Sequence, residues 1–345
     1  MIAVAVSGGV DSMIAAHLLR QETPDVFAVH FLTGFEPPHT GPRHPIHGIG
    51  DRLGIAVHVV DLSVEFRTHV VDYFTAAYRS GQTPNPCVIC NPAIKFGAVL
   101  RFAAALGAGC LATGHYATVR RDSSGRYRLH KGVDPRKDQS YFLARLGQDQ
   151  LAQARFPLGA LTKDRVRALA ALNGLHPVET AESQDVCFVT SSAYTDFMQP
   201  DGPAPQDPGP IETVAGQVVG RHAGLARFTV GQRRGINCPA AAPYYVVRLE
   251  PERNTLVVGT REDLLTARCR IEDINWIAPP PNGPMRARTR VRYRTPEAPG
   301  TVTPLDPQTA LVEFDTPQSA VTPGQAAVFY DGDAVLGGGF IARQR

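Results

Sequence analysis

The chain has 345 residues, a formal net charge of +3, 43% apolar residues and 19% charged residues. This length predicts two or three domains with ample core, and the composition is typical of a soluble globular protein. The mild positive charge excludes a uniformly basic nucleic-acid-binding protein, so any RNA face must be a local patch. Without a signal peptide or an apolar stretch of transmembrane length, the sequence predicts a cytoplasmic chain with no membrane partner.

The first apolar run, residues 2–6, breaks at Ser7-Gly8-Gly9, and a helical pattern follows Asp11-Ser12. A strand, a glycine turn and a helix N-terminus place backbone N–H groups around an anion, and the two glycines allow a phosphate to approach closely. A carboxylate such as Asp11 suits a phosphate site mainly through a divalent cation. The string is neither a Walker A loop nor a GxGxxG fingerprint, and an ordinary βα turn is the alternative interpretation.

Further apolar runs predict strands at 26–32, 55–62 and 110–113, and these alternate with helical patterns at 66–78 and 94–106. This alternation predicts an α/β domain with a doubly wound parallel sheet. Ligands of such sheets bind at the carboxyl ends of the strands. That edge would collect residues 7–12, Leu32 and Gly114-His115.

After a predicted hairpin at 119–131, residues 151–174 carry a helical pattern whose Lys163, Arg165 and Arg167 are interpreted as a solvated face. The proline-rich stretch 200–210 is interpreted as a linker, and short alternating runs follow it at 227–230, 244–249 and 255–258. A second proline cluster at 279–284 precedes another β-rich stretch. The predicted domains are therefore 1–199, 200–278 and 279–345, an α/β domain followed by two small β-rich domains.

The six cysteines indicate thiol chemistry or metal binding rather than structural disulfides in such a chain. Cys87 and Cys90 form a CxxC, but no second CxxC or CxxH completes a zinc site. Cys187 lies where a polar run turns apolar, which leaves a reactive thiol and a buried side chain equally open. The other cysteines, 110, 238 and 269, are interpreted as small buried residues. Histidines 39, 44 and 47 lack acidic or cysteine partners, so we predict no metal ligands.

Seven motifs carry a resemblance to known families. They are SGGVDS (7–12), PNPCVICNPAIKFG (84–97), ATGHYA (112–117), KGVDPRKDQSYFL (131–143), PLGALTKDRVR (157–167), ESQDVCF (182–188) and FTVGQRRGI (228–236). The first resembles the PP-loop of ATP pyrophosphatases, which cleave ATP between the α and β phosphates. Together, in this order, the motifs resemble the bacterial tRNA-specific 2-thiouridylase family, and the match covers nearly the whole chain.

The resemblance implies an adenine nucleotide α-hydrolase-like PP-loop domain, a central tRNA-binding β-rich domain and a C-terminal β-barrel. The implied activity is that of a tRNA-uridine 2-sulfurtransferase, which uses ATP and Mg²⁺ to thiolate the wobble uridine at position 34. ATP adenylates O2 of the uridine with release of pyrophosphate, and a persulfide on Cys187 then attacks C2 and releases AMP. Cys90 attacks the bridging sulfur, which frees 2-thiouridine and leaves a Cys90–Cys187 disulfide.

The resemblance also implies the binding residues and partners. The residues that match ATP contacts are Ala5, Val6, Ser7, Gly8, Gly9, Val10, Asp11, Ser12, Leu32 and Gly114. The residues that match tRNA contacts are Asn85, Pro86, Cys87, His115, Lys137, Asp138, Gln139, Arg292, Tyr293 and Gln325. The implied partners are the anticodon arm of tRNA, a cysteine desulfurase or a sulfur-relay carrier, and a thiol reductant.

This chain departs from the family pattern at two places, and three further interpretations stay open. Residues 32–36 read Leu-Thr-Gly-Phe-Glu, where family members commonly read Met-Lys-Asn-Trp and then acidic residues. Position 87 is often Asp in the family, so Cys87, Cys90 and Cys187 could instead bind an iron–sulfur cluster that delivers sulfur. An amidating or lysidine-type ligase is the second interpretation, and an RNA-binding module without chemistry is the third. Both reactive thiols require an electropositive setting, for which ATP-bound metal, Lys95 and the RNA pocket are candidates.

Overall fold

The computed structural model describes residues 1–36, 44–176, 186–189, 208–239 and 242–343. Its N-terminal domain is built on a five-stranded sheet of order β3-β2-β1-β4-β7, in which every pairing is parallel. The strands are β1 (Ile2–Ala5), β2 (Val26–Leu32), β3 (Val57–Asp61), β4 (Cys110–Ala112) and β7 (Ala154–Arg155). Successive residues enter different cores, Ala3 and Phe27 on one face and Val4 and Ala28 on the other, so both faces are covered.

Helices cover each face of the sheet. On one side lie α1 (Val10–Glu22), α2 (His47–Leu53) and α9 (Lys163–Leu172). On the other side lie two long helical segments: α3 (Ser63–Phe66), η1 (Arg67–Val71) and α4 (Asp72–Arg79), then α5 (Pro86–Cys90), η2 (Asn91–Val99) and α6 (Leu100–Ala105). The short helices α7 (Ser140–Leu143) and α8 (Gln148–Ala152) follow. The predicted doubly wound parallel fold is confirmed.

Two predicted helices have different limits in the structure. The helix expected at 94–106 begins at Pro86, because proline fits the first helical turn, where its missing N–H costs nothing. The CxxC therefore lies on the first turns of this helix. The single helix expected at 151–174 is interrupted by β7 and begins again only at Lys163, where the Thr162 hydroxyl accepts from the Arg165 N–H at 3.3 Å.

The segment Pro86–Ala105 also corrects an expectation drawn from composition. This helix has 20 residues and a mean hydropathy of 1.4, which is long and apolar enough to cross a membrane. The sequence interpretation overlooked it. However, 56% of its apolar window is buried inside the protein, and Val88, Ile94 and Phe96 pack in the main core. Burial against the sheet explains its apolar composition.

Two β-rich units follow. The first is a sheet of order β10-β11-β8-β9, with β8 (Gly209–Thr213), β9 (Val218–His222), β10 (Tyr245–Glu250) and β11 (Thr255–Gly259). The second contains β12 (Leu265–Trp276), β13 (Met285–Arg290), β14 (Ala298–Asp306), β15 (Thr309–Ser319), β16 (Ala326–Asp331) and β17 (Ala334–Ile341). Its antiparallel order β12-β15-β14-β13-β16-β17 is closed by the β12–β17 pairing, so the expected barrel is confirmed.

Three 3₁₀ turns complete this half: η3 (Leu225–Arg227), η4 (Pro251–Arg253) and η5 (Glu262–Leu264). The run 227–230, expected as a strand, instead leaves η3 in an irregular segment. The domain limits 1–199, 200–278 and 279–345 stay a prediction.

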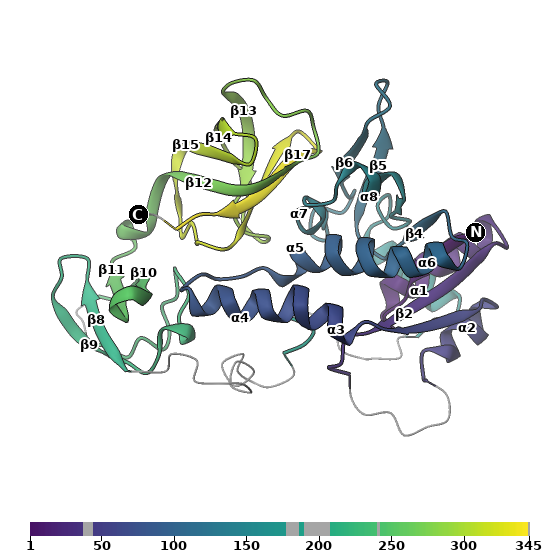
Figure 1. The fold of residues 1–345 in the computed structure, drawn as a ribbon, viewed down its shortest axis with the longest axis horizontal. Helices are drawn as coiled ribbons and strands as arrows, with labels where there is room; N and C mark the ends of the chain where they lie inside the picture. The colour runs from purple at the N-terminus through teal and green to yellow at the C-terminus, as the bar shows by residue number, and fades with distance from the viewer. Residues whose placement is uncertain (37–43, 177–185, 190–207, 240–241, 344–345) are drawn as a thin grey trace.

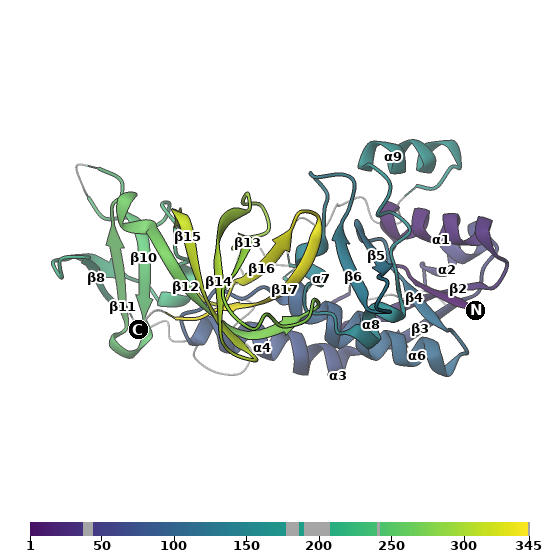
Figure 2. The ribbon, with the colours of Figure 1, turned by 90° about the horizontal axis from the view of Figure 1, so that it is seen from above.

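Figure 1 shows how the domains are arranged. The parallel sheet lies at one end of an elongated molecule and the β8–β11 sheet at the other, while the barrel sits between them, above the two long helical segments; Figure 2 shows the same order from above. The hairpin of β5 (Ala117–Arg121) and β6 (Tyr127–Lys131) extends from the first domain to the barrel, where His130 pairs with Ala334 of β17. The barrel is thus joined to the first domain by backbone pairing.

Candidate active site

The loop after β1 is closed by its own serines. Gly8 has a φ of +89°, a conformation that favours glycine, and Gly9 precedes α1 without any side-chain cap. The Ser12 hydroxyl accepts from the Ser7 N–H at 3.2 Å and donates to the Gly9 carbonyl at 2.9 Å. The first N–H groups of α1 therefore have no capping side chain, which is the arrangement that binds a phosphate at a helix N-terminus.

Asp11, in the same loop, is held by two side chains that the sequence interpretation did not connect to it. The Lys163 ammonium donates to both Asp11 carboxylate oxygens at 2.9 Å, and the Tyr116 hydroxyl donates to one of them at 2.8 Å. Burial, reinforced by the Asp11 charge, raises the pKa of Tyr116, which therefore keeps its proton. Lys163 is 6% exposed, so its expected place on a solvated face is wrong. Lys163 therefore balances the charge of Asp11, while the carboxylate, whose side chain is 34% exposed, keeps lone-pair capacity for a further partner.

Gly114 and Leu32 lie at the same edge of the sheet. A Cβ at Gly114 would lie 2.9 Å from the Asp11 carbonyl carbon and from the Ser12 nitrogen, so only glycine fits against the loop. Leu32 ends β2, next to β1, and its carbonyl accepts from the Leu62 N–H at 3.0 Å. The residues with predicted ATP contacts are thus brought to one sheet edge.

A second cluster, the thiol cluster, consists of Cys87, Cys90 and Cys187. Cys87 and Cys90 lie one helical turn apart on α5, and Cys187 comes from a separate segment of the chain. The three are free thiols, and their charges interact, because both Cys87 and Cys187 raise the pKa of Cys90. The structure therefore brings together the two cysteines that the sequence assigned to catalysis, with Cys87 beside them.

Cys187 is positioned by the residue that follows it. Phe188 is 1% exposed. Its ring packs edge-on against the rings of Phe66 and Phe74, with centroids 5.6 and 5.2 Å away, and the centroid of the Phe35 ring lies at 5.8 Å. Sequence reasoning identified the switch from polar to apolar residues here but not the anchoring role of Phe188. An aromatic side chain in the core holds the exposed Cys187 at the rim of the site.

Burial dominates the titration of these thiols. It raises the pKa of Cys90 to about 12, and it also raises the pKa values of Cys87 and Cys187. Since Cys87 and Cys187 both reach the surface, water reduces the shift there compared with the more enclosed Cys90. The Lys95 ammonium opposes burial at all three thiols.

Lys95 and His115 connect the two clusters. The Lys95 ammonium lies 3.5 Å from Nε2 of His115, and His115 directly follows Gly114, which contacts the nucleotide loop. The thiol cluster and the loop are therefore neighbours along the carboxyl edge of the sheet, where α/β proteins bind their ligands.

Most of the residues with predicted tRNA contacts are engaged within the protein. Gln325 of the barrel donates to the carbonyls of Thr83 and Pro84, at 3.0 and 3.2 Å, just before α5. Arg292 donates to the Val230 carbonyl at 2.7 Å and to the Thr322 hydroxyl. These two side chains therefore join the barrel to the Cys90 helix and to the central domain.

Side chains of the Lys137-Asp138-Gln139 motif also make contacts within the protein. Asp138 is buried and accepts from Arg290 of β13 at 3.2 Å, and Gln139 accepts from the Tyr116 N–H at 3.0 Å. Lys137 is half-buried. The ring of Tyr293 lies 4.3 Å from that of Phe142.

The remaining residues of this set lie close to the thiols. Asn85 directly precedes α5, and Pro86 is buried at its first position. His115 is 9% exposed, so little of its surface is available to RNA in this conformation.

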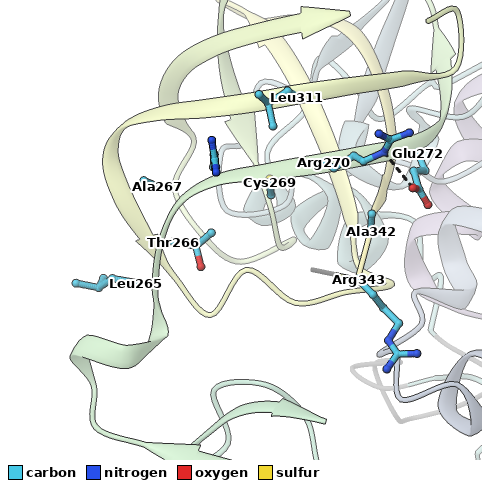
Figure 3. Close-up of a pocket in the computed structure, with 10 residues that line it drawn as sticks. Leu265, Thr266, Ala267, Cys269, Arg270, Glu272, Leu311, Ala342 and Arg343 are labelled. Atoms are coloured by element: carbon cyan, nitrogen blue, oxygen red, sulfur yellow. Dashed lines mark hydrogen bonds and ion pairs between the residues drawn. The ribbon is translucent and has the colours of Figure 1, made fainter. Parts of the chain in front are cut away.

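A hollow in the described chain lies away from this chemistry. It has a volume of about 730 Å³ and is lined mainly by the first half of β12 and by the residues just after β17. Arg268, Arg270 and Arg343 are among its lining residues (Figure 3). None of the predicted catalytic or ATP-contacting residues lines it. The geometry of the sheet edge, rather than the size of this hollow, identifies the candidate active site.

The described residues show no ready site for an iron–sulfur cluster. Among the described ranges, no group of three His, Cys, Asp or Glu side chains is arranged to hold a metal ion. His39 lies outside those ranges, and the centroid of the His44 ring lies 4.9 Å from that of His30, with the two rings tilted to each other. The three thiols lie in one cluster but do not form a ligand set.

A nucleotide-binding α/β domain followed by two β-rich domains defines the class, and comparison with known proteins gives the family. Family models match residues 1–191 as a "tRNA methyl transferase HUP domain", 196–260 as a "tRNA methyl transferase PRC-barrel domain" and 266–341 as an "aminomethyltransferase beta-barrel domain". The tRNA-specific 2-thiouridylase MnmA of Desulfosudis oleivorans is 54% identical over 99% of this chain and 94% of its own length. That of Syntrophotalea carbinolica is 45% identical over 99% and 98%.

This chain therefore belongs to the tRNA-specific 2-thiouridylase family. A solved structure of the U34-tRNA thiolase NcsA from Methanococcus maripaludis with its [4Fe-4S] cluster has 20% sequence identity and a TM-score of 0.35, covering 54% of this chain and 60% of that one. A likeness this low carries no argument about the chemistry of the thiols.

Proposed function

We propose that this protein thiolates the wobble uridine of tRNA at C2, with ATP as the source of activation. The family relationship over 99% of the chain supports this reaction, and it does not favour a lysidine-type ligase or a cluster-dependent route. The observation that carries the proposal is that a candidate phosphate-binding loop and a cluster of thiols lie at the same edge of the sheet. The loop after β1 lies against Gly114, and the thiols whose charges interact are influenced by Lys95, which contacts His115, the residue after Gly114.

The first half of the reaction uses the nucleotide loop. The uncapped N-terminus of α1 receives the phosphates, and Lys163 and Tyr116 fix Asp11 below them. The uridine O2 attacks the α-phosphate, and pyrophosphate leaves. Mg²⁺ stays a prediction; the Asp11 carboxylate, together with the phosphates of ATP, would hold it.

The second half uses the thiol cluster. The terminal sulfur of a persulfide on Cys187 attacks C2, a C–S bond forms and AMP leaves. The Cys90 thiolate then attacks Sγ of Cys187, the S–S bond to the transferred sulfur breaks, and its electron pair stays on 2-thiouridine. The new Cys90–Cys187 disulfide requires two electrons from a thiol reductant. A cysteine desulfurase or a relay carrier supplies the persulfide, and we place the reaction in the cytoplasm.

The barrel and the central domain receive the anticodon arm in this proposal. Turning a base out of its stack costs a few kcal/mol, which contacts with the arm must offset. We retain the domain assignment 1–199 for catalysis and 200–278 and 279–345 for tRNA binding as part of the proposal.

The test combines the protein with tRNA, ATP, a cysteine desulfurase and a thiol reductant, and measures 2-thiouridine by nucleoside mass analysis. We expect product with the natural chain and none with Cys187→Ala or Cys90→Ala. Cys110→Ala, a change in a strand of the sheet, is the matched control and should retain activity. Full activity of either catalytic variant would refute the assignment.

A further inference from the structure

The thiol cluster lies beside one ammonium group that acts on every member of it. The charge of Lys95 opposes the effect of burial at Cys87, Cys90 and Cys187. Burial alone disfavours thiolates, and a cation in the same site is the usual means of recovering them. The Glu36 carboxylate acts in the opposite direction on Cys187, but its oxygens accept hydrogen bonds from Thr33 and from the Gly34 N–H.

The helix geometry explains why Lys95 faces the thiols. Lys95 is five positions after Cys90, and in an α-helix this spacing would turn the two side chains about 140° apart. However, residues 91–99 form a π-helix, and the Leu100 N–H donates to the Lys95 carbonyl five residues earlier. The wider turn brings positions five apart toward the same side of the helix.

His115 holds the Lys95 ammonium in this position. Nδ1 of His115 lies 2.7 Å from the Thr113 hydroxyl, and Nε2 lies 3.5 Å from Lys95 Nζ. Burial, and then the Lys95 charge, lower the pKa of His115 well below its usual value, so the ring is neutral. A neutral ring that donates from Nδ1 to Thr113 presents an acceptor at Nε2 to the ammonium.

We propose that Lys95, positioned by His115, supplies the positive charge that stabilises the Cys90 thiolate and the sulfur anion on Cys187 during sulfur transfer. The inference rests on the proposed function for its role in catalysis. Both groups attack as anions, and the protons they lose pass to solvent. Lys95 needs no contact with the RNA for this role, and His115 acts through Lys95 as a positioning residue.

The test measures thiol reactivity in the free protein, without tRNA or ATP. Each cysteine is followed by peptide mass analysis during alkylation with iodoacetamide at pH 8. Lys95→Met should slow alkylation of Cys90 and Cys187 about tenfold, which corresponds to about one pKa unit. Lys95→Arg keeps the charge and should restore most of the rate, and His115→Ala should cause a smaller loss in the same direction. Cys238, whose pKa only burial raises, is the internal control and should not change.

Unchanged alkylation of Cys90 and Cys187 in Lys95→Met would overturn the inference. An equal loss in Lys95→Arg would also overturn it, because a structural role of the side chain would then explain both variants. If Lys95→Met lowers the melting temperature, Lys95→Gln gives the same comparison with a polar neutral side chain. A natural chain that thiolates no tRNA but shows the predicted alkylation differences would contradict the proposed function and still support the charge effect of Lys95.

Discussion

The nucleotide loop and the thiol cluster lie at the same sheet edge but are held in place differently. Hydrogen bonds within six residues close the loop, and a buried ammonium fixes its Asp11. The thiol cluster is assembled from a helix and a distant segment, and the side chain that anchors this segment is the ring of Phe188. The difference indicates that the backbone of the nucleotide loop is closed locally and that one distant ammonium fixes its carboxylate, whereas the thiol cluster depends on the packing of a separate segment. Mutations in the two regions should therefore impair pyrophosphate release and sulfur transfer separately.

The largest expected effect comes from removing the aromatic anchor. Phe188→Ala should cost about 3 kcal/mol of unfolding free energy, because a buried ring is replaced by a cavity. Formation of 2-thiouridine should fall at least tenfold while tRNA-dependent pyrophosphate release persists. Chemical denaturation and the two activity assays measure these changes. Phe188→Leu and the neighbouring Val189→Ala are the controls, and full thiolation by Phe188→Ala would show that the ring does not position Cys187.

Lys163→Met tests the other region. It leaves the Asp11 carboxylate without its ammonium, and breaking such a pair should cost about 2 kcal/mol, less than for a fully buried pair, because the Asp11 side chain is 34% exposed. Pyrophosphate release should fall at least tenfold, which corresponds to about 1.4 kcal/mol. Arg165→Met, on the exposed side of the same helix, should behave like the natural chain. Normal pyrophosphate release by Lys163→Met would contradict this account.

The pH dependence sharpens the comparison. Because burial raises the pKa of Cys90 to about 12, its thiolate fraction should rise about tenfold for each pH unit between 7 and 9. The single-turnover rate of sulfur transfer should rise with pH over this window, toward that limit. Pyrophosphate release, which uses no thiol, should change much less. A flat or falling profile for sulfur transfer would argue against an attacking Cys90 thiolate.

The smallest expected effect is that of Gln325→Ala. The change removes two hydrogen bonds to the segment before the Cys90 helix, each worth about 1 kcal/mol. We expect a several-fold loss of kcat for thiolation with little change in tRNA affinity, measured by steady-state kinetics and by RNA binding. Gln308→Ala, in an exposed turn of the barrel, is the control. A loss of affinity at unchanged kcat would instead favour the direct tRNA contact that the sequence predicted.

Features that depend on contiguous residues could be predicted from the sequence, whereas contacts between residues far apart in the sequence could not. A strand, a glycine turn and a helix start fix the nucleotide loop from contiguous residues, so the parallel sheet and its edge could be predicted. The burial of Lys163 depends on Asp11, 152 residues away, and a run of alternating basic residues gave no sign of it. Likewise, the sequence alone could not indicate that Asp138, Arg292 and Gln325 have partners in other domains.

The most direct test of the central claim is the redox state of Cys90 and Cys187 after one turnover. The protein is loaded with a persulfide on Cys187, reacted with tRNA and ATP without reductant, and digested for peptide mass analysis. We expect one Cys90–Cys187 disulfide for each 2-thiouridine formed, and none when ATP is omitted. Formation of 2-thiouridine with both thiols still free would contradict the account.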